Sequence, residues 1–305
     1  MQVTFIVNSQ IKKLRKVIHE VGEVFYNLSD VNASIVQTHE AGHAQRLARE
    51  VTMKGCDYII AVGGDGTLHE VLNGMMQANI PINKYPILGV LPRGSANDFV
   101  KTIGAPATIK GILDMILSHT YQKIDIGKIT KPNERDFGRY FINIAGLGLG
   151  PEVVKLMENK NTFFGSSMAY FSSIIKGFSS YQKRRILCET DSWTWEGELL
   201  QMAVANAKYF GHGLCVSPEA DVGDGLFHVT LFGNISLIDY IKNLGNLKNG
   251  KKIQHENAHY YQAQDIVITS LGGDSCSIEA DGEFVADCPV KISILPNALK
   301  FLANE

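Results

Sequence analysis

The first third of the chain alternates short β-rich runs with segments of helical periodicity, and this alternation constrains the fold more than any other feature. The β-rich runs occupy residues 3–7, 33–37, 58–62 and 87–91, and the helical patterns occupy residues 14–28, 44–53, 68–76 and 109–117. Residues 58–62 and 87–91 are apolar throughout, which is typical of strands buried on both faces. Strands that alternate with helices form βαβ units, so a doubly wound parallel sheet is predicted.

The rest of the chain has a different rhythm. Strands are predicted at residues 123–129, 140–144, 185–189 and 199–205, and helical spacing recurs only at residues 152–158, 169–178 and 237–247. This pattern predicts a β-rich, antiparallel second domain that begins near residue 125. At the end of the chain we predict a strand at 290–295 and a short helical run at 297–302, which could belong to either domain.

Composition sets broad limits on function. The 305 residues are enough for two domains, and the formal net charge of −2 gives no electrostatic footprint for nucleic acid. The N-terminus lacks the features of a secretory signal, and no apolar stretch is long enough to span a bilayer. We therefore expect a cytoplasmic protein without a transmembrane segment. The five cysteines form no CxxC pair, which argues against a structural zinc site and favours inert thiols.

The sequence GGDGT at residues 63–67 follows the apolar run 58–62 and precedes a helical pattern. It is thus expected at the carboxyl end of a parallel strand, where open α/β sheets bind ligands. Glycines let backbone amides approach an anion, and the helix N-terminus adds N–H donors and partial positive charge. These features predict a phosphate site. The alternative is a tight turn in which Asp65 or Thr67 caps the helix, with Glu70 completing a capping box.

Two further loops are expected at the same edge of the sheet. The sequence LPRGSANDF at residues 91–99 follows the next strand, and THEAGHA at residues 38–44 follows an earlier one. In the first loop Ser95 can donate to a phosphate, while Asp98 offers a carboxylate to a metal or a substrate hydroxyl. The alternative is that Ser95 or Asn97 caps a short helix.

Two acidic clusters lie beside predicted strands in the second half, at residues 218–227 and 279–284. In the first, Asp221 and Asp224 are three residues apart in a glycine-containing loop. Together with the carbonyl of Leu226 they could hold a hard cation through oxygen ligands. A solvated acidic turn is the alternative.

In the second cluster, Asp281 and Glu283 interrupt a strand pattern. As a base, Glu283 could take the proton of an attacking hydroxyl. A hairpin with an Asp-Gly turn is the alternative. The nearby run GLGLG at residues 146–150 is followed by Pro151 and opens no βαβ unit, so close backbone packing or a bend explains it better than a dinucleotide site.

Together these motifs resemble the diacylglycerol kinase catalytic-domain family, and in particular the bacterial soluble lipid kinases related to sphingosine and ceramide kinases. The resemblance covers nearly the whole chain and rests on the order of THEAGHA, GGDGTLHEV, LPRGSANDF, FINIAGLGLG, ANAKYFGHGLCVSPEADVGDGLF and EADGEF. It implies a nucleotide-binding α/β domain of residues 1–124, on which residues 291–305 pack back. It also implies an antiparallel β-sandwich domain of residues 125–290 that receives the lipid.

The resemblance further implies ATP and Mg²⁺ as cofactors. Glu283 would be the proton acceptor, with Asp65, Asp98 and Asp281 completing the catalytic set. A structural Mg²⁺ would be held by Asp221, Asp224 and the Leu226 carbonyl. The expected nucleotide-binding residues are Thr38, Gly63, Gly64, Asp65, Gly66, Thr67, Leu68, His69, Glu70, Ser95 and Asn97.

The sequence departs from the family pattern in three places. The turn Asn8-Ser9-Gln10-Ile11 lacks the Pro and Gly of the usual NPxSG-like turn, so phosphate contacts there are not carried over. Ser95 replaces a more usual Thr but retains the hydroxyl. His69 stands where Asn is common, and this change removes no group that the chemistry needs.

The expected reaction is transfer of a phosphoryl group from MgATP to a lipid hydroxyl, with diacylglycerol as the expected acceptor. An NAD kinase shares the GGDGT loop and a similar two-domain plan, and a non-catalytic nucleotide or lipid sensor is a second alternative. The lipid would be met at a membrane surface. Aromatic residues in 163–185 could lie against a bilayer with Arg184 and Arg185 near anionic headgroups, or form a buried helix with a solvated basic end. The sequence leaves open whether the protein is a homodimer.

Overall fold

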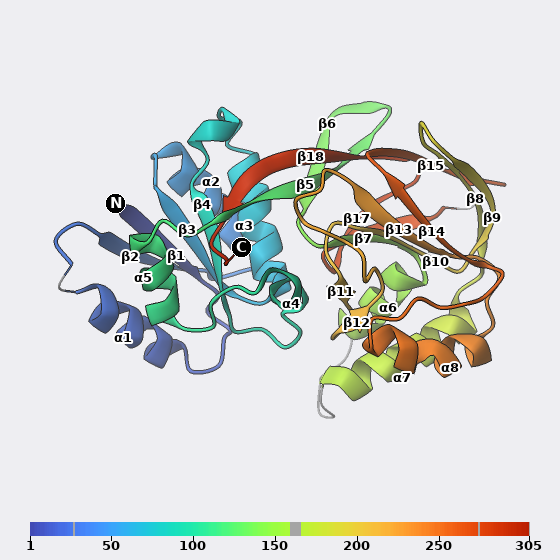
Figure 1. The fold of residues 1–305 in the computed structure, drawn as a ribbon, viewed down its shortest axis with the longest axis horizontal. Coiled ribbons are helices and arrows are strands. Elements are labelled where there is room, and N and C mark those ends of the chain that lie inside the picture. The colour runs from blue at the N-terminus through green and yellow to red at the C-terminus, as the bar shows by residue number, and fades with distance from the viewer. Residues whose placement is uncertain (27, 159–165, 274, 305) are drawn as a thin grey trace. The chain divides into compact units, whose positions relative to one another are not determined.

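The computed structural model describes residues 1–26, 28–158, 166–273 and 275–304. The chain divides into two compact units, one of residues 1–125 with 297–305 and one of residues 126–296 (Figure 1). The first unit is α/β and the second is built on antiparallel sheets, as the sequence predicts.

The first unit holds a parallel sheet in the order β2-β1-β3-β4. The C-terminal end of β18 (Val290–Phe301) completes it by pairing in parallel with β4 at Phe301 and Leu88. Its elements are β1 (Gln2–Val7), α1 (Leu14–Phe25), β2 (Asn32–Gln37), α2 (His43–Met53), β3 (Tyr58–Gly63), α3 (Asp65–Met76), a 3-10 helix (Ile82–Lys84), β4 (Ile87–Pro92), α4 (Asp98–Ile103) and α5 (Ile109–Leu117).

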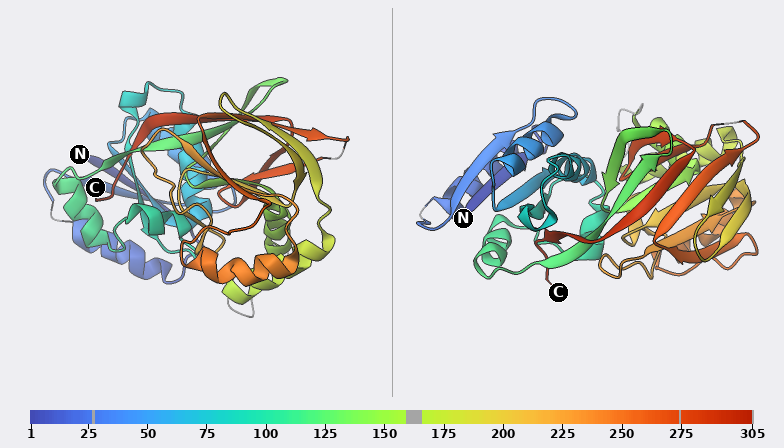
Figure 2. Two further views of the ribbon diagram at one scale, coloured as in Figure 1. Left: turned by 45° about the vertical axis from the view of Figure 1, so that its right-hand side comes forward. Right: turned by 90° about the horizontal axis from the view of Figure 1, so that it is seen from above.

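Helices cover both faces of this sheet (Figure 2). Val3, Phe5 and Val7 of β1 form one apolar cluster with the buried sides of α1 and α5. Because strand side chains alternate between faces, the residues between them point the other way, toward α2 and α3. Burial on both faces explains why β3 carries no charged side chain along its length.

Among its described residues, the second unit contains parts of two large sheets and a two-stranded pair of β11 and β12. One large sheet is six-stranded and antiparallel, in the order β14-β13-β10-β7-β16-β17. The other joins β18, β15, β8 and β9, with β5 beside β18 and β6 beside β5. The elements are β5 (Gln122–Lys131), β6 (Glu134–Phe141), β7 (Ile144–Gly148), α6 (Leu149–Glu158), α7 (Ser166–Ser180), β8 (Arg184–Glu189), β9 (Thr194–Leu199), β10 (Gln201–Ala205), β11 (Tyr209–Phe210), β12 (Leu214–Cys215), β13 (Phe227–Phe232), α8 (Leu237–Lys248), β14 (Ala258–Ala263), β15 (Asp265–Leu271), β16 (Ser277–Ala280) and β17 (Glu283–Asp287).

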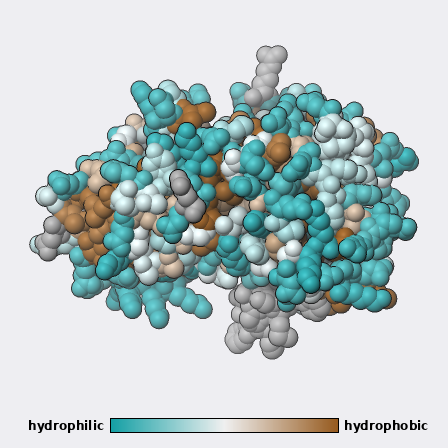
Figure 3. All heavy atoms as spheres, viewed as in Figure 1, coloured by the Kyte–Doolittle hydropathy of each residue, from teal (hydrophilic) through white to brown (hydrophobic). Residues whose placement is uncertain are grey.

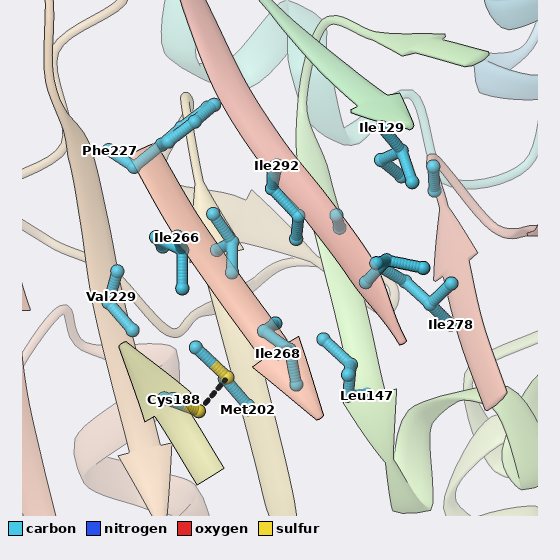
Figure 4. Packing of buried hydrophobic residues seen from close by; sticks show 14 of the residues in the cluster. Ile129, Leu147, Cys188, Met202, Phe227, Val229, Ile266, Ile268, Ile278 and Ile292 are labelled. Carbon is cyan, nitrogen blue, oxygen red and sulfur yellow. Dashed lines mark hydrogen bonds between the residues drawn. The ribbon is translucent and has the colours of Figure 1, made fainter. Parts of the chain in front are cut away.

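The six-stranded sheet is the middle layer of this unit. Met202 and Val204 of β10 point into the apolar core between the two sheets (Figure 4). Ala203 and Ala205, on the opposite face, join a second cluster that includes residues of α6, α7 and α8. The layers are therefore sheet, sheet and helices, which confirms the predicted sandwich.

Three details of the predicted secondary structure are wrong. Residues 297–301 continue β18 as a strand, where a helix was predicted at 297–302, because Phe301 and Leu302 are fully buried and tertiary packing overrides local propensity. The predicted strand 140–144 is broken between β6 and β7, since the amides of residues 142 and 143 bond a side chain. The predicted strand 199–205 breaks at Leu200, where the chain leaves one sheet and enters the other.

The face of the molecule in Figure 3 is mostly hydrophilic, with hydrophobic residues in separate patches. Across the described ranges, no helix has the length and apolar character needed to cross a bilayer.

Candidate active site

The loops of the first unit gather at one edge of the parallel sheet. Thr38 follows β2 and is tied to β1, because its N–H donates to the Val7 carbonyl at 2.9 Å. Just after β1, the side-chain amide of Asn8 donates to Thr67 Oγ1 at 3.0 Å. The next N–H, of Ser9, donates to Thr38 Oγ1 at 3.3 Å. The structure thus brings Thr38, the turn after β1 and the GGDGT loop together.

The GGDGT and LPRGSANDF loops are in direct contact through two glycines. A Cβ built on Gly94 would lie 2.4 Å from the Cα of Gly64, and a Cβ on Gly64 would lie 3.0 Å from the Cα of Gly94. No other residue type fits this approach without displacing backbone. The N–H of Arg93 also donates to the carbonyl of Gly63 at 2.7 Å, so the loops form one structure with their amides side by side.

Asp65 joins the two loops through its carboxylate. Its Oδ2 accepts the N–H of Asp98 at 3.1 Å, and its Oδ1 accepts the N–H of Phe99 at 3.3 Å, so it caps the N-terminus of α4. Asp65 is also the first residue of α3, where an acidic group would compete with a bound phosphate. Because the Asp65 carboxylate caps α4, its negative charge is held at the N-terminus of α4.

The remaining residues of LPRGSANDF support the turn. Asn97 Oδ1 accepts the N–H of Gly94 at 3.1 Å, and its Nδ2 donates to the Gly94 carbonyl at 2.9 Å. Asn97 therefore shapes the loop instead of capping α4 with its side chain. Ser95 is exposed at the tip, where its hydroxyl can reach a ligand. Asp98 is buried and ion-paired with Lys101 at 2.5 Å.

Glu70 does not form the capping box considered above. Its two carboxylate oxygens accept the N–H groups of Gly42 and Ala44 at 2.8 and 3.0 Å, which fixes the start of α2 beside the site. Leu68 and His69 are buried in the unit. The Leu68 N–H also donates to the Gly64 carbonyl at 3.1 Å, so these two positions support the loop from inside α3 and do not present free donors.

In the second unit, Asp281 and Glu283 lie on the β16–β17 hairpin. Asp281 and Gly282 have φ angles of 54° and 89°, as a tight turn between antiparallel strands requires, so the Asp-Gly hairpin alternative is confirmed. Glu283 is exposed at the start of β17, where a substrate hydroxyl could reach its carboxylate.

The carboxylate of Asp281 is held by the backbone at the break between β6 and β7. It accepts the N–H groups of Ile142, Asn143 and Ile144 at 3.1, 2.9 and 3.3 Å. The N–H of Asp281 also donates to the Ile144 carbonyl at 3.0 Å. These bonds fix the turn that presents Glu283, which is the arrangement expected of a positioning residue.

Glu279 is a residue of this hairpin that sequence reasoning missed. Its side chain is buried, and burial raises its pKa to about 8, with the charges of Asp281 and Glu283 acting in the same direction. The Gly282 N–H donates to it and partly opposes the shift. A Cβ on Gly146 would lie 2.3 Å from Glu279 Oε1, so the GLGLG run provides space for this carboxyl and the predicted close packing is confirmed.

The predicted metal loop precedes β13. Asp221 Oδ1 accepts the N–H of Gly223 at 3.0 Å, and Asp224 Oδ1 accepts the N–H of Leu226 at 2.9 Å. Nε2 of the buried His228 lies 2.9 Å from Asp224 Oδ2 and fixes the orientation of that carboxylate. Both aspartates are exposed, and two carboxylates with a backbone carbonyl are the oxygen donors that Mg²⁺ prefers, so the residues fit this ion.

The metal loop and the Glu283 hairpin emerge at the same edge of the six-stranded sheet. His228 pairs with Ala205, and Ala205 pairs with Ile144. Ile144 in turn bonds Asp281. Three strand spacings separate the ends of this row, roughly 14 Å at about 4.8 Å per strand.

Asn143 lies next to this row and was also missed. Its Nδ2 donates to the Tyr209 carbonyl at 2.9 Å, while its Oδ1 is buried without a hydrogen-bond partner in the described part of the chain. The only signal in the sequence is a polar residue between the apolar residues Ile142 and Ile144.

Part of the predicted membrane segment lies outside the described residues, namely residues 163–165. Within the remainder, Ile174 is buried, and Phe178 packs on Tyr240 of α8 with ring centroids 5.3 Å apart. Arg185 is paired with Glu196 at 2.5 Å. This portion of α7 therefore packs on the interior of the second unit, as the buried-helix alternative predicts.

Comparison with known proteins agrees with this arrangement. Residues 2–129 match the model of the diacylglycerol kinase catalytic domain, and residues 146–303 match that of the YegS C-terminal NAD kinase beta sandwich-like domain. The chain belongs to this lipid kinase family. Residues 130–145 lie between the two matches, which together include all the predicted site residues.

Named relatives resemble this chain in sequence, and solved structures share its fold. A diacylglycerol kinase of Bacillus subtilis (strain 168) is 28% identical over 80% of this chain and 77% of that protein. A Yersinia pestis (strain Pestoides F) protein named "Probable lipid kinase YegS-like" is 27% identical over 92% of this chain and 91% of its own length. The crystal structure of a diacylglycerol kinase from Bacillus anthracis str. Sterne shares the fold, with a TM-score of 0.70, 22% identity and coverage of 99% and 97% of the two chains.

Proposed function

We propose that the protein is an ATP-dependent kinase that transfers the γ-phosphoryl group to a lipid hydroxyl, with diacylglycerol as acceptor and phosphatidic acid as product. The observation that carries the proposal is the contact of Gly64 with Gly94, which joins two glycine loops at a sheet edge and beside the N-terminus of α3. Such an arrangement is suited to the phosphates of a nucleotide. Membership of a lipid kinase family supports the choice of acceptor.

In the proposed reaction, Thr38 and Ser95 donate hydroxyl hydrogen bonds to ATP, and the amides of residues 63–67, up to the first turn of α3, face its phosphates. Asp65 and Asp98 hold the two loops and α4 in place. Glu283 accepts the proton of the lipid hydroxyl as its oxygen attacks phosphorus. Asp281 fixes the orientation of Glu283.

Mg²⁺ fits the oxygen donors of Asp221, Asp224 and Leu226, and when bound it would add positive charge at the sheet edge that carries Glu283. His228 would orient Asp224 by the hydrogen bond described above. The exposed positions of these donors leave room for water to complete the coordination.

The deciding experiment offers labelled ATP with diacylglycerol in mixed micelles, with other hydroxyl lipids or with NAD. We expect labelled phosphatidic acid from the wild type and a loss of at least about 100-fold in Glu283→Gln, the scale of general-base catalysis. Glu256→Gln, at an exposed glutamate of the same unit, is the matched control.

Label on NAD alone would replace the proposal with an NAD kinase. Full activity of Glu283→Gln would remove this residue from the chemistry. Failure of the wild type to label any lipid or NAD, while still binding ATP, would favour a nucleotide or lipid sensor.

We also propose that the protein acts from the cytoplasm, where ATP is available, and meets its lipid by peripheral contact. Ile238 and Ile241 of α8 and Ile175 of α7 are exposed. Lys176 and Lys242 follow two of them in sequence and are exposed as well. Apolar side chains beside lysines suit a bilayer that contains anionic lipid.

Sedimentation with vesicles of anionic and neutral lipid tests this surface. Replacing Ile238 and Ile241 with serine should release the protein from anionic vesicles, whereas Ile82→Ser, at an exposed isoleucine of the first unit, should not. Equal sedimentation of both variants would contradict the assignment.

A further inference from the structure

Two of the five cysteines lie directly across from each other at the open end of the β16–β17 hairpin. Cys276 precedes β16 and Cys288 follows β17, and the register that pairs Ser277 with Asp287 places the two cysteines opposite one another. The N–H of Cys288 donates to the Cys276 carbonyl at 2.9 Å, so the ladder continues through this pair. In a hydrogen-bonded antiparallel pair the Cα atoms are about 5.5 Å apart, which is within the range that a disulfide spans.

The two thiols also contact each other. A hydrogen bond between the side chains of Cys276 and Cys288 lowers the pKa of Cys276 and raises that of Cys288. The Gly148 amide and the Arg184 charge further favour the Cys276 thiolate, against the opposing effects of burial and Asp287. Cys276 is thus the better nucleophile and Cys288 is in position to react with it.

The surroundings allow a small oxidant to reach this pair. Cys276 borders a cavity of about 330 Å³ that Tyr181 and Arg184 also line. Cys288 is partly exposed. Across the described residues no group of three or more metal-ligating side chains is found, so a metal site does not account for the two cysteines.

Cys188 is nearby but differs in its contacts. Its Sγ points at Met202 Sδ, 3.8 Å away, inside the core between the sheets (Figure 4). Burial raises its pKa to about 12, which leaves an unreactive thiol. The local environment therefore makes Cys188 less reactive than the Cys276–Cys288 pair.

We propose that Cys276 and Cys288 form a reversible oxidation site that converts to an intramolecular disulfide. With a hydroperoxide as oxidant, the Cys276 thiolate attacks the terminal peroxide oxygen, the O–O bond breaks, and Cys276 becomes a sulfenic acid as water or an alcohol leaves. Cys288 then attacks Cys276 Sγ, the S–S bond forms and the sulfenic oxygen leaves as water. In total, two thiols lose two hydrogens and one peroxide is reduced.

The bond would close the β16–β17 hairpin at the end opposite its turn. The turn carries Asp281, Gly282 and Glu283, so oxidation would tie together both strands that support them. The chemistry of the pair itself does not depend on the proposed kinase reaction.

The test treats the reduced full-length protein with stoichiometric hydrogen peroxide and maps peptides without reduction. We expect a Cys276–Cys288 linkage, loss of two of the five thiols, a raised melting temperature and recovery of all thiols with dithiothreitol. Cys188→Ala should form the same bond. In Cys288→Ser, Cys276 should persist as a sulfenic acid that dimedone labels, and the melting temperature should not rise.

Three results would overturn the inference: linkage of Cys276 to another cysteine, direct conversion of Cys276 to sulfinic or sulfonic acid, or survival of both thiols at a peroxide dose that oxidises Cys56. Peptide mapping of the wild type decides among these even if a cysteine variant does not fold.

Discussion

The carboxyl group of Glu279 accepts the backbone N–H of Gly282 at 2.8 Å, within the turn that presents Glu283. Burial raises its pKa to about 8, so the group is mostly protonated at neutral pH. Glu279 is thus a protonated, neutral acid within the hairpin that carries Asp281 and Glu283. The sequence alone would suggest a third carboxylate at this position. Ionising Glu279 would add a buried charge next to both of them.

This pKa predicts how stability depends on pH. The ordinary value is 4.5 and the folded value is about 8, so the folded state binds the proton more tightly. Stability from this group is present in full below about pH 4.5 and is lost as pH rises to about 8. The free energy of unfolding should fall by about 1.4 kcal/mol per pH unit within that window.

Urea unfolding of wild type and Glu279→Gln between pH 5 and 9 measures this difference. Glutamine keeps the hydrogen-bond acceptor but does not titrate, so the wild type should lose stability relative to the variant as pH rises. Parallel curves for the two proteins would show that Glu279 is ionised throughout.

Asp281→Asn should destabilise the protein. The amide keeps one acceptor and turns a donor toward backbone N–H groups, so a buried bond is replaced by an unfavourable contact of about 1–3 kcal/mol. Asp191→Asn, at an exposed aspartate, is the control and should unfold like the wild type. Equal melting temperatures for all three proteins would contradict the positioning role of Asp281.

Gly94→Ala should separate the two glycine loops. The added methyl group would lie 2.4 Å from the Cα of Gly64, so the backbone must move and nucleotide affinity should fall by tenfold or more, about 1.4 kcal/mol or greater. Gly22→Ala is the control, because an added Cβ in α1 has no neighbour within 4 Å and alanine favours a helix by about 1 kcal/mol. Calorimetry should show ATP binding weakened tenfold or more in Gly94→Ala and unchanged in Gly22→Ala.

Mg²⁺ should stabilise the protein through Asp221 and Asp224. At ten times the dissociation constant, binding to the folded state alone adds about 1.4 kcal/mol, and chelation should remove this gain. Asp221→Asn should abolish the Mg²⁺-dependent rise in melting temperature, whereas Asp191→Asn should retain it. A rise of equal size in both variants would place the ion elsewhere.

The sequence predicted where the loops of the first unit would gather, because the carboxyl ends of parallel strands share one edge. It could not predict the Gly64–Gly94 contact or the use of Glu70, since both depend on how two loops pack in space. Glu70 in particular satisfied the capping-box pattern with Thr67, yet it bonds the backbone of a different helix.

In the second unit, the features that could not be predicted from the sequence have a different cause. Asp281 bonds amides that lie 137–139 residues earlier in the chain, which no local pattern reveals. The burial of Glu279 was hidden because β16 belongs to a sheet covered on both faces, so alternation along the strand does not separate inside from outside. The space left by Gly146 accommodates this side chain.

The backbone N–H of Asn297 donates to Asp125 Oδ1 at 2.7 Å across 172 residues of chain. Phe301 then packs on Phe99 with ring centroids 5.3 Å apart and pairs with Leu88 of β4, so the parallel sheet includes a strand that is translated after the whole second unit. During translation β4 remains an unpaired edge strand until residue 297 and its successors emerge, although N-terminal domains commonly fold first. The first unit can therefore complete its sheet only after residues 126–296 have been translated.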